Sequence, residues 1–93
     1  MNVIYKYNFG PLSTGIKTVT IQNEINYILD FQEQDGNMVM WASVGESTVP
    51  RQITIDSVWT GYVHPDWTYV GTIQGSDWLV YHIFMKPYID KVE

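Results

Sequence analysis

The sequence predicts an all-β protein, a single small antiparallel sandwich or barrel of about seven strands with at most one short helical turn. Three observations predict this class. Residues that favour strands, the β-branched and aromatic ones, are concentrated in short runs. Several runs alternate between apolar and polar residues, which is the period of a strand. Short segments containing Gly, Pro, Asn or Asp separate the runs. The 93 residues are expected to form one domain, 1–93.

The first strand is expected in residues 3–9, where every second residue is apolar. These residues, which share one face of the strand, are Val3, Tyr5, Tyr7 and Phe9. A loop that contains Gly and Pro follows at 10–15, and residues 16–21 predict a second, β-branched strand. The polar residues 22–24 are expected to interrupt it as a turn or a single helical turn.

A hairpin is expected next, over residues 25–44. Strict alternation places four apolar side chains on one face of its first strand, namely Ile25, Tyr27, Leu29 and Phe31. Asp35 and Gly36 tolerate the positive φ angles of a two-residue type I′ turn, so they should connect the two strands. In the second strand, Trp41 is expected on the face opposite to Met38, Met40 and Ala42.

The chain is expected to end in a second hairpin. A polar loop at 45–50 leads to a fifth strand at 51–59. The apolar runs 69–74 and 78–85 are then separated only by residues 75–77, the spacing of a β-hairpin. The last run is apolar on both faces. We therefore expect it to be covered on both sides, by another sheet or by a partner chain.

The composition indicates that part of the surface is hidden in contacts. Ten acidic and five basic residues give a net charge of −5, which argues against binding to duplex nucleic acid. Charged residues make up 16% of the chain, against a common value of about 25%. Aromatic residues make up 15%. This balance favours a protein that makes protein–protein or ligand contacts. The other interpretation is that a thin β core uses large residues.

The short chain needs support beyond its own core. A domain of this size buries roughly 60–65% of the surface of its unfolded chain, and disulfides, metals or oligomerisation are the usual supports. The sequence has no Cys, which excludes disulfides and thiolate zinc sites, and it has two His. We expect no metal, no cofactor and a homo-oligomer. No apolar run reaches the ~18 residues of a membrane span and the first residues do not read as a signal peptide, so a cytoplasmic location without membrane contact is expected.

Eight residues are candidates for ligand binding. The segment 59–67 places two Trp, a Tyr and a His in nine irregular residues, and it either packs back on the core or forms a recognition surface. Arg51 and Lys86 could hold a phosphate or carboxylate beside a stacking ring. His82, in an apolar strand, is either a ligand-binding residue or a core histidine with hydrogen-bond partners. The full set is Arg51, Trp59, Thr60, Tyr62, His64, Trp67, His82 and Lys86.

No motif indicates catalysis. The sequence contains no Gly-x-Ser-x-Gly element, no Cys and no phosphate-binding glycine loop. The acidic pair Glu33 and Asp35 flanks a turn and is explained by turn formation and solvation. We expect a protein that is not an enzyme.

The order of several short motifs resembles a family of small uncharacterised phage and prophage proteins. Members of that family read "IYKY", "LWA", "TGH", "YIGTxQ" and "LVxHVF" in this order. The matching segments here are Ile4–Tyr7, Met40–Ala42, Thr60-Gly61 with His64, Tyr69–Gln74 and Leu79–Phe84. This chain departs from the third motif, because Tyr62 and Val63 separate Gly61 from His64. The resemblance implies a phage setting and the cytoplasm of a bacterial host during infection.

Together these observations lead to one functional expectation with stated alternatives. We expect a non-catalytic phage accessory protein, acting in counter-defence, that oligomerises and sequesters a small ligand such as a nucleotide immune signal. The alternatives are an inhibitor that binds a host protein directly and a structural or morphogenetic phage component.

Overall fold

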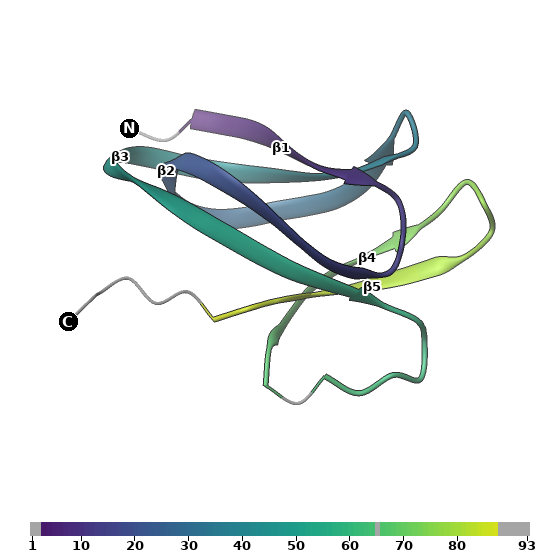
Figure 1. The fold of residues 1–93 in the computed structure, drawn as a ribbon. Coiled ribbons are helices and arrows are strands. Elements are labelled where there is room, and N and C mark those ends of the chain that lie inside the picture. Colours follow the sequence, from purple (N-terminus) through teal and green to yellow (C-terminus); the bar gives the residue numbers. More distant parts are fainter. Residues whose placement is uncertain (1–2, 65, 88–93) are drawn as a thin grey trace.

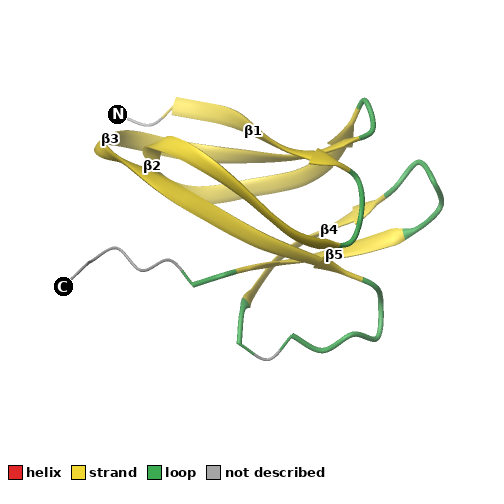
Figure 2. Ribbon diagram, in the orientation of Figure 1, coloured by secondary structure: helices red, strands yellow, loops and turns green. Residues whose placement is uncertain are grey.

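The computed structural model describes residues 3–64 and 66–87, and this part of the chain forms one antiparallel sheet of five strands without a helix (Figures 1 and 2). The predicted class, all-β and antiparallel, is confirmed. The strands are β1 (Val3–Pro11), β2 (Gly15–Gln34), β3 (Asn37–Val58), β4 (Thr68–Gln74) and β5 (Val80–Met85).

The long strand β3 organises the sheet. Strand β2 runs along one edge of β3, and the other edge is shared by β1 and β5. β1 pairs with the first half of β3, from Asn8 opposite Val39 to Val3 opposite Val44. β5 pairs with the second half, and β4 adds to the far edge of β5. The sheet curls into a half-barrel, as Figure 1 shows, and its concave face holds the core. The radius of gyration is 13.3 Å, against about 12 Å for a compact domain of this length.

The described chain has five strands rather than about seven because β2 and β3 continue through both expected interruptions. Ile21 pairs with Arg51, and the next pair joins Asn23 to Glu46. One residue of β2, Gln22, therefore lies opposite residues 47–50 of β3. Such an irregularity bends a strand strongly without ending it. The bend lets β2 and β3 each contribute to both halves of the curled sheet.

The turn between β2 and β3 is the predicted one. Asp35 and Gly36 have φ angles of +53° and +80°, as both central residues of a type I′ turn require. Gln34 pairs with Asn37 directly across it. As predicted, Trp41 lies on the other face of β3 from the buried side chains of Met38, Met40 and Ala42. The Lys6 ammonium lies 5.6 Å from the centre of the Trp41 ring.

The expected alternation in the first strand of this hairpin is wrong. Ladder irregularities lie between Ile25 and Tyr27 and between Ile28 and Asp30. Each inserts one extra residue into β2, so the inward positions become Ile25, Ile28 and Phe31, opposite the buried residues of β3. Tyr27 and Leu29 are 67% and 50% exposed. A period of three has replaced the period of two.

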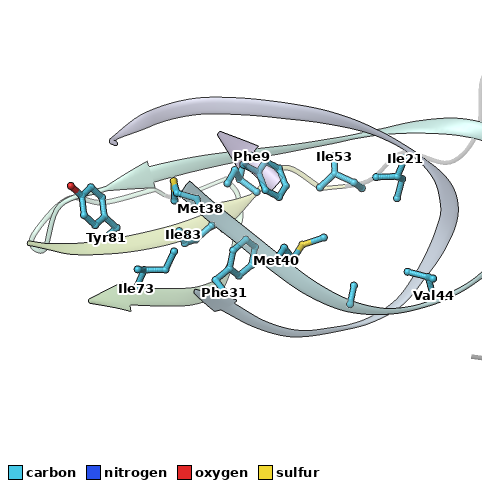
Figure 3. Packing of buried hydrophobic residues seen from close by; sticks show 12 residues of the cluster. Phe9, Ile21, Phe31, Met38, Met40, Val44, Ile53, Ile73, Tyr81 and Ile83 are labelled. Carbon is cyan, nitrogen blue, oxygen red and sulfur yellow. The ribbon is translucent and has the colours of Figure 1, made fainter. Parts of the chain in front are cut away.

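The core fills the concave face of the sheet, as Figure 3 shows. Phe31 is 3% exposed and packs against Phe9, with ring centres 6.3 Å apart. Gly71 of β4 lies against the other side of the ring, since a Cβ there would lie 3.1 Å from Phe31 Cδ2. The two halves of the sheet therefore meet around this ring. The other buried members are Ile21, Met38, Met40, Ala42, Val44, Ile53, Ile55, Ile73, Tyr81 and Ile83.

The final hairpin is shorter than expected. β5 begins at Val80, so Trp78 and Leu79 lie in the connecting loop instead of in the strand. Tyr81 and Ile83 are buried in the core, whereas His82 and Phe84 on the opposite face are half-buried. That second face is covered in part by the chain's own segment 59–67, which the next section describes.

Candidate ligand-binding site

The segment 59–67 leaves the sheet through a tight turn. The backbone N–H of Tyr62 donates to the carbonyl of Trp59 at 3.2 Å. Gly61, third in this turn, has a φ of +93°, a conformation that a residue with a side chain rarely adopts. The Thr60-Gly61 pair therefore sets the direction in which Tyr62 and the following residues leave β3. Pro65 lies outside the described residues.

His82 ties the start of this segment to the last hairpin. Its Nε2 lies 2.7 Å from the Thr60 hydroxyl and its Nδ1 lies 3.1 Å from the Thr72 hydroxyl. The hydroxyl of Thr72 also bonds to that of Tyr69. Both ring nitrogens of His82 thus have partners. The ring is a hydrogen-bonded link between the segment and β4, and it lies half-buried on the outer face instead of in the core.

His64 folds back onto the outer face of β3 and β5. Its Nε2 lies 3.1 Å from Asp56 Oδ2. The ring stacks on Phe84, with centres 5.2 Å apart, and packs against Trp67 at 4.7 Å. Its buried Nδ1 has no hydrogen-bond partner in the described part of the chain. These contacts of the two ring nitrogens favour the tautomer in which Nε2 carries the proton and donates it to the carboxylate, because a buried Nδ1–H would lack an acceptor.

A hollow of about 230 Å³ lies beside this histidine–carboxylate pair. Its lining combines two exposed rings with polar groups from the start of β2 and the end of β3. The lining residues are Thr14, Gly15, Asp56, Ser57, Val58, Trp59 and Tyr62.

The chemistry of the hollow suits a flat ring with N–H groups. Trp59 and Tyr62 are 45% and 65% exposed, so their faces are available for stacking. Asp56 supplies a carboxylate that accepts hydrogen bonds, whereas the Ser57 hydroxyl is buried and is not presented to the hollow. Lys17 lies at the same end, where its ammonium donates to the backbone carbonyl of Ser13 at 3.1 Å. Burial lowers the pKa of Lys17, and attraction to Asp56 opposes that shift.

Six of the eight candidate residues come together, and two do not. Thr60 bonds to His82 and His64 packs on Trp67 on the outer face, whereas Trp59 and Tyr62 line the adjoining hollow. Arg51 lines a separate open cleft of about 570 Å³ with Glu24 and Glu46, where its Nε lies 3.4 Å from the Ser47 hydroxyl. Lys86 is exposed after β5, and its backbone N–H donates to the carbonyl of Thr54.

Sequence reasoning missed the residues that strand pairing supplies. Asp56 has no distinguishing pattern in the sequence of the strand expected at 51–59, yet it joins His64 to the hollow. Thr72 and Phe84 contact the two histidines from β4 and β5. The topology, which brings residues far apart in the chain together, is the only feature that reveals these contacts.

Within the described residues, no group of three or more His, Asp or Glu side chains is placed to hold a metal ion. The described part of the chain also contains no helix that is long and apolar enough to cross a membrane.

The fold and the site define a class: a small all-β domain with one curled antiparallel sheet and an aromatic, histidine-bearing outer face. Residues 1–91 match the family described as a domain of unknown function, DUF7352, and the chain belongs to that family. No curated protein and no solved structure matches the chain significantly.

Proposed function

We propose that this chain is a non-catalytic accessory protein of a bacteriophage or prophage. It oligomerises in the cytoplasm of the bacterial host and sequesters a small ligand, such as a nucleotide used as an immune signal. The observation that carries the proposal is the hollow at Asp56, where exposed aromatic faces stand beside hydrogen-bond acceptors.

The size and lining of the hollow support a nucleobase-like ligand. Sites for whole small molecules commonly enclose about 300–1,000 Å³, and the hollow of about 230 Å³ is smaller. It suits one flat heterocycle better than a complete nucleotide. Trp59 and Tyr62 supply stacking surfaces, and the Asp56 carboxylate accepts hydrogen bonds from ring N–H or amino groups. The net charge of −5 disfavours burying phosphates beside Asp56, so a captured nucleotide would keep its phosphates in solvent at the rim.

The exposed apolar surface supports an oligomer. Among the described residues, thirteen large hydrophobic side chains are classed as exposed. Scattered exposed apolar residues are normal, but contiguous ones mark contact surfaces. Trp59, Tyr62 and Val63 are close in sequence and 45–75% exposed. A second copy that covers this end would also supply the support that a thin core lacks.

The arrangement of the histidines supports a non-catalytic role. A general base must reach the proton that it removes. The Nε2 of His64 faces Asp56 and its Nδ1 is buried, while both nitrogens of His82 face threonine hydroxyls. Neither ring presents an unoccupied nitrogen to the hollow. The phage setting is supported by the motif order described above.

Two measurements test the proposal. Native mass spectrometry of protein purified from infected cells is expected to show an oligomer that retains a small molecule. Calorimetry against AMP, GMP, their cyclic forms and the cyclic dinucleotides of both bases is expected to detect binding. Trp59→Ala should weaken that binding, whereas Tyr27→Ala, an exposed ring on β2, should not. No heat with any nucleotide, together with no retained mass, contradicts the proposal.

A direct inhibitor of a host protein is the second candidate. The observation that favours it is Trp78, which is 95% exposed, because tryptophan is enriched among the residues that anchor protein interfaces. A host protein that binds the wild type and loses affinity for Trp78→Ala would support this candidate over ligand capture.

A further inference from the structure

The loop between β4 and β5 presents an exposed tryptophan from a hydrogen-bonded turn. Trp78 is 95% exposed and has a φ of +70°, a conformation that bulky residues rarely adopt. Leu79 beside it is 46% exposed. A large apolar ring held in an unusual backbone conformation and presented to solvent is a feature that demands an explanation outside the protomer's own core.

The loop is held by hydrogen bonds that order the backbone on both sides of Trp78. The N–H of Gly75 donates to the carbonyl of Leu79 at 2.8 Å, and the N–H of Trp78 donates back to the carbonyl of Gly75 at 3.1 Å. The Asp77 carboxylate accepts from the N–H of Leu79 and from the hydroxyl of Tyr81. Glu33 of β2 accepts from both the N–H and the hydroxyl of Ser76 at 2.7 Å. A loop backbone that is already ordered loses less conformational entropy on binding than a flexible one.

The exposed ring and the hollow lie at the same end of the molecule. Trp59, which lines the hollow, packs against Tyr81 with ring centres 5.1 Å apart. The hydroxyl of Tyr81 in turn bonds to Asp77, the neighbour of Trp78. Figures 1 and 2 show the β4–β5 loop projecting from the end of the sheet at which β2 begins and β3 ends. One residue, Tyr81, thus connects both features.

The hollow needs another wall. A bound small molecule typically has 70–90% of its surface buried, but this hollow is smaller than most complete sites and its rings at Trp59 and Tyr62 are about half exposed. A ring stacked there would have one face covered and the other in solvent. The protomer's own Trp78 does not close the hollow, since almost all of that side chain is exposed.

We propose that Trp78 of a second copy completes the ligand site, covering the hollow at Trp59 and Tyr62. Because Tyr81 connects the turn of Trp78 to Trp59 at the hollow, a two-fold axis at this end can place each Trp78 against the hollow of the other copy. A flat ligand would then lie between Trp59 of one protomer and the partner's Trp78. This inference rests on the proposed function and specifies how the oligomer and the ligand site are related.

Mixing two variants tests the contact directly. Sedimentation velocity of the wild type, with and without the nucleotide panel named above, is expected to show a dimer or a larger closed assembly. Trp78→Ala and Trp59→Ala should each weaken self-association at least about 30-fold. Trp78→Ala keeps an intact hollow and Trp59→Ala keeps an intact Trp78, so an equimolar mixture should regain a dimer through the one remaining pair. Tyr27→Ala is the matched control and should associate like the wild type.

Each outcome decides the proposal. Circular dichroism checks folding, and Tyr62→Ala, whose side chain is 65% exposed, replaces Trp59→Ala if that variant unfolds. A wild type that stays monomeric under all conditions overturns the inference, as does a Trp78→Ala variant of unchanged mass or a mixture without recovery. Nucleotide binding that survives Trp78→Ala overturns it while leaving the proposed function intact. Association without any nucleotide binding retains the Trp78 contact but contradicts ligand capture.

Discussion

The two bulges in β2 make a quantitative prediction that strict alternation would reverse. Ile28 and Leu29 are adjacent and similar in size, so truncating each to Ala removes a comparable amount of side chain. Ile28 packs against the core opposite Ala42, whereas Leu29 is 50% exposed at the second irregularity. The alternating pattern would instead place Leu29 inside with Phe31 and leave Ile28 outside.

The expected magnitudes follow from burial. Ile→Ala in a core costs 2–5 kcal/mol, and partly buried Ile28 belongs at the lower end, at about 2 kcal/mol. Leu29→Ala should cost about 0.5 kcal/mol, as for other surface positions. With a urea m-value of about 1.5 kcal/mol per molar, the unfolding midpoints should fall by about 1.3 M and 0.3 M respectively.

The assay is urea unfolding followed by tryptophan fluorescence and far-UV circular dichroism. Both variants and the wild type are measured at one protein concentration, because self-association makes stability depend on concentration. Coincident curves from the two probes justify the two-state analysis. Equal losses for Ile28→Ala and Leu29→Ala, or a larger loss for Leu29→Ala, would refute the bulged register.

Three further substitutions test the last hairpin. The hydrogen bond to Asp77, together with burial, raises the pKa of Tyr81 to about 12. The stabilisation from this hydrogen bond is therefore full below the unfolded pKa of about 10 and is lost as the pH rises through 12. In urea titrations, the stability advantage of the wild type over Tyr81→Phe should shrink between pH 10 and 12. Gly71→Val should lower stability by about 1–3 kcal/mol, because even a Cβ at this position lies 3.1 Å from Phe31 Cδ2; an unchanged urea midpoint would contradict the close packing. Gly75→Ala should shift the loop, since its Cβ would overlap Asp77 and come within 3.1 Å of the Tyr81 ring; the expected readout is a changed near-ultraviolet dichroism signal, and an identical spectrum would contradict it.

The parts of the fold that local chemistry controls could be predicted from the sequence. Asp35 and Gly36 fix a type I′ turn because both tolerate a positive φ, and the structure places the turn there. The all-β class follows from strand-forming residues and alternation. The bulges could not be predicted, because Ile25 to Phe31 fits a period of two as well as a period of three. The choice is made by the buried residues of β3, which are pairing partners distant in sequence.

In the candidate site, too, single residues could be predicted from the sequence but their partners could not. Trp59, His64 and His82 attract attention as single residues, since aromatic and histidine side chains in a loop or an apolar strand need an explanation. Their partners could not be predicted, because Asp56 and Thr72 have no distinguishing local pattern. Arg51 is a candidate from its chemistry alone, since a guanidinium can hold a phosphate or carboxylate. The ladder break between β2 and β3 carries it into a different cleft.

The exposure of the four tryptophans shows how much apolar surface the protomer leaves uncovered. If a solitary protomer satisfied its own apolar surface, all four rings should be buried, since each removes roughly 150–250 Å² from water. Instead Trp41 and Trp67 are half-buried, Trp59 is 45% exposed and Trp78 is 95% exposed. The two most exposed rings, Trp59 and Trp78, are both connected to Tyr81. A uniformly thin core would leave rings exposed without regard to position, whereas a surface built for contact concentrates them. Trp59 and Trp78, linked through Tyr81, follow the second pattern, which is the arrangement that the proposed contact between two copies requires.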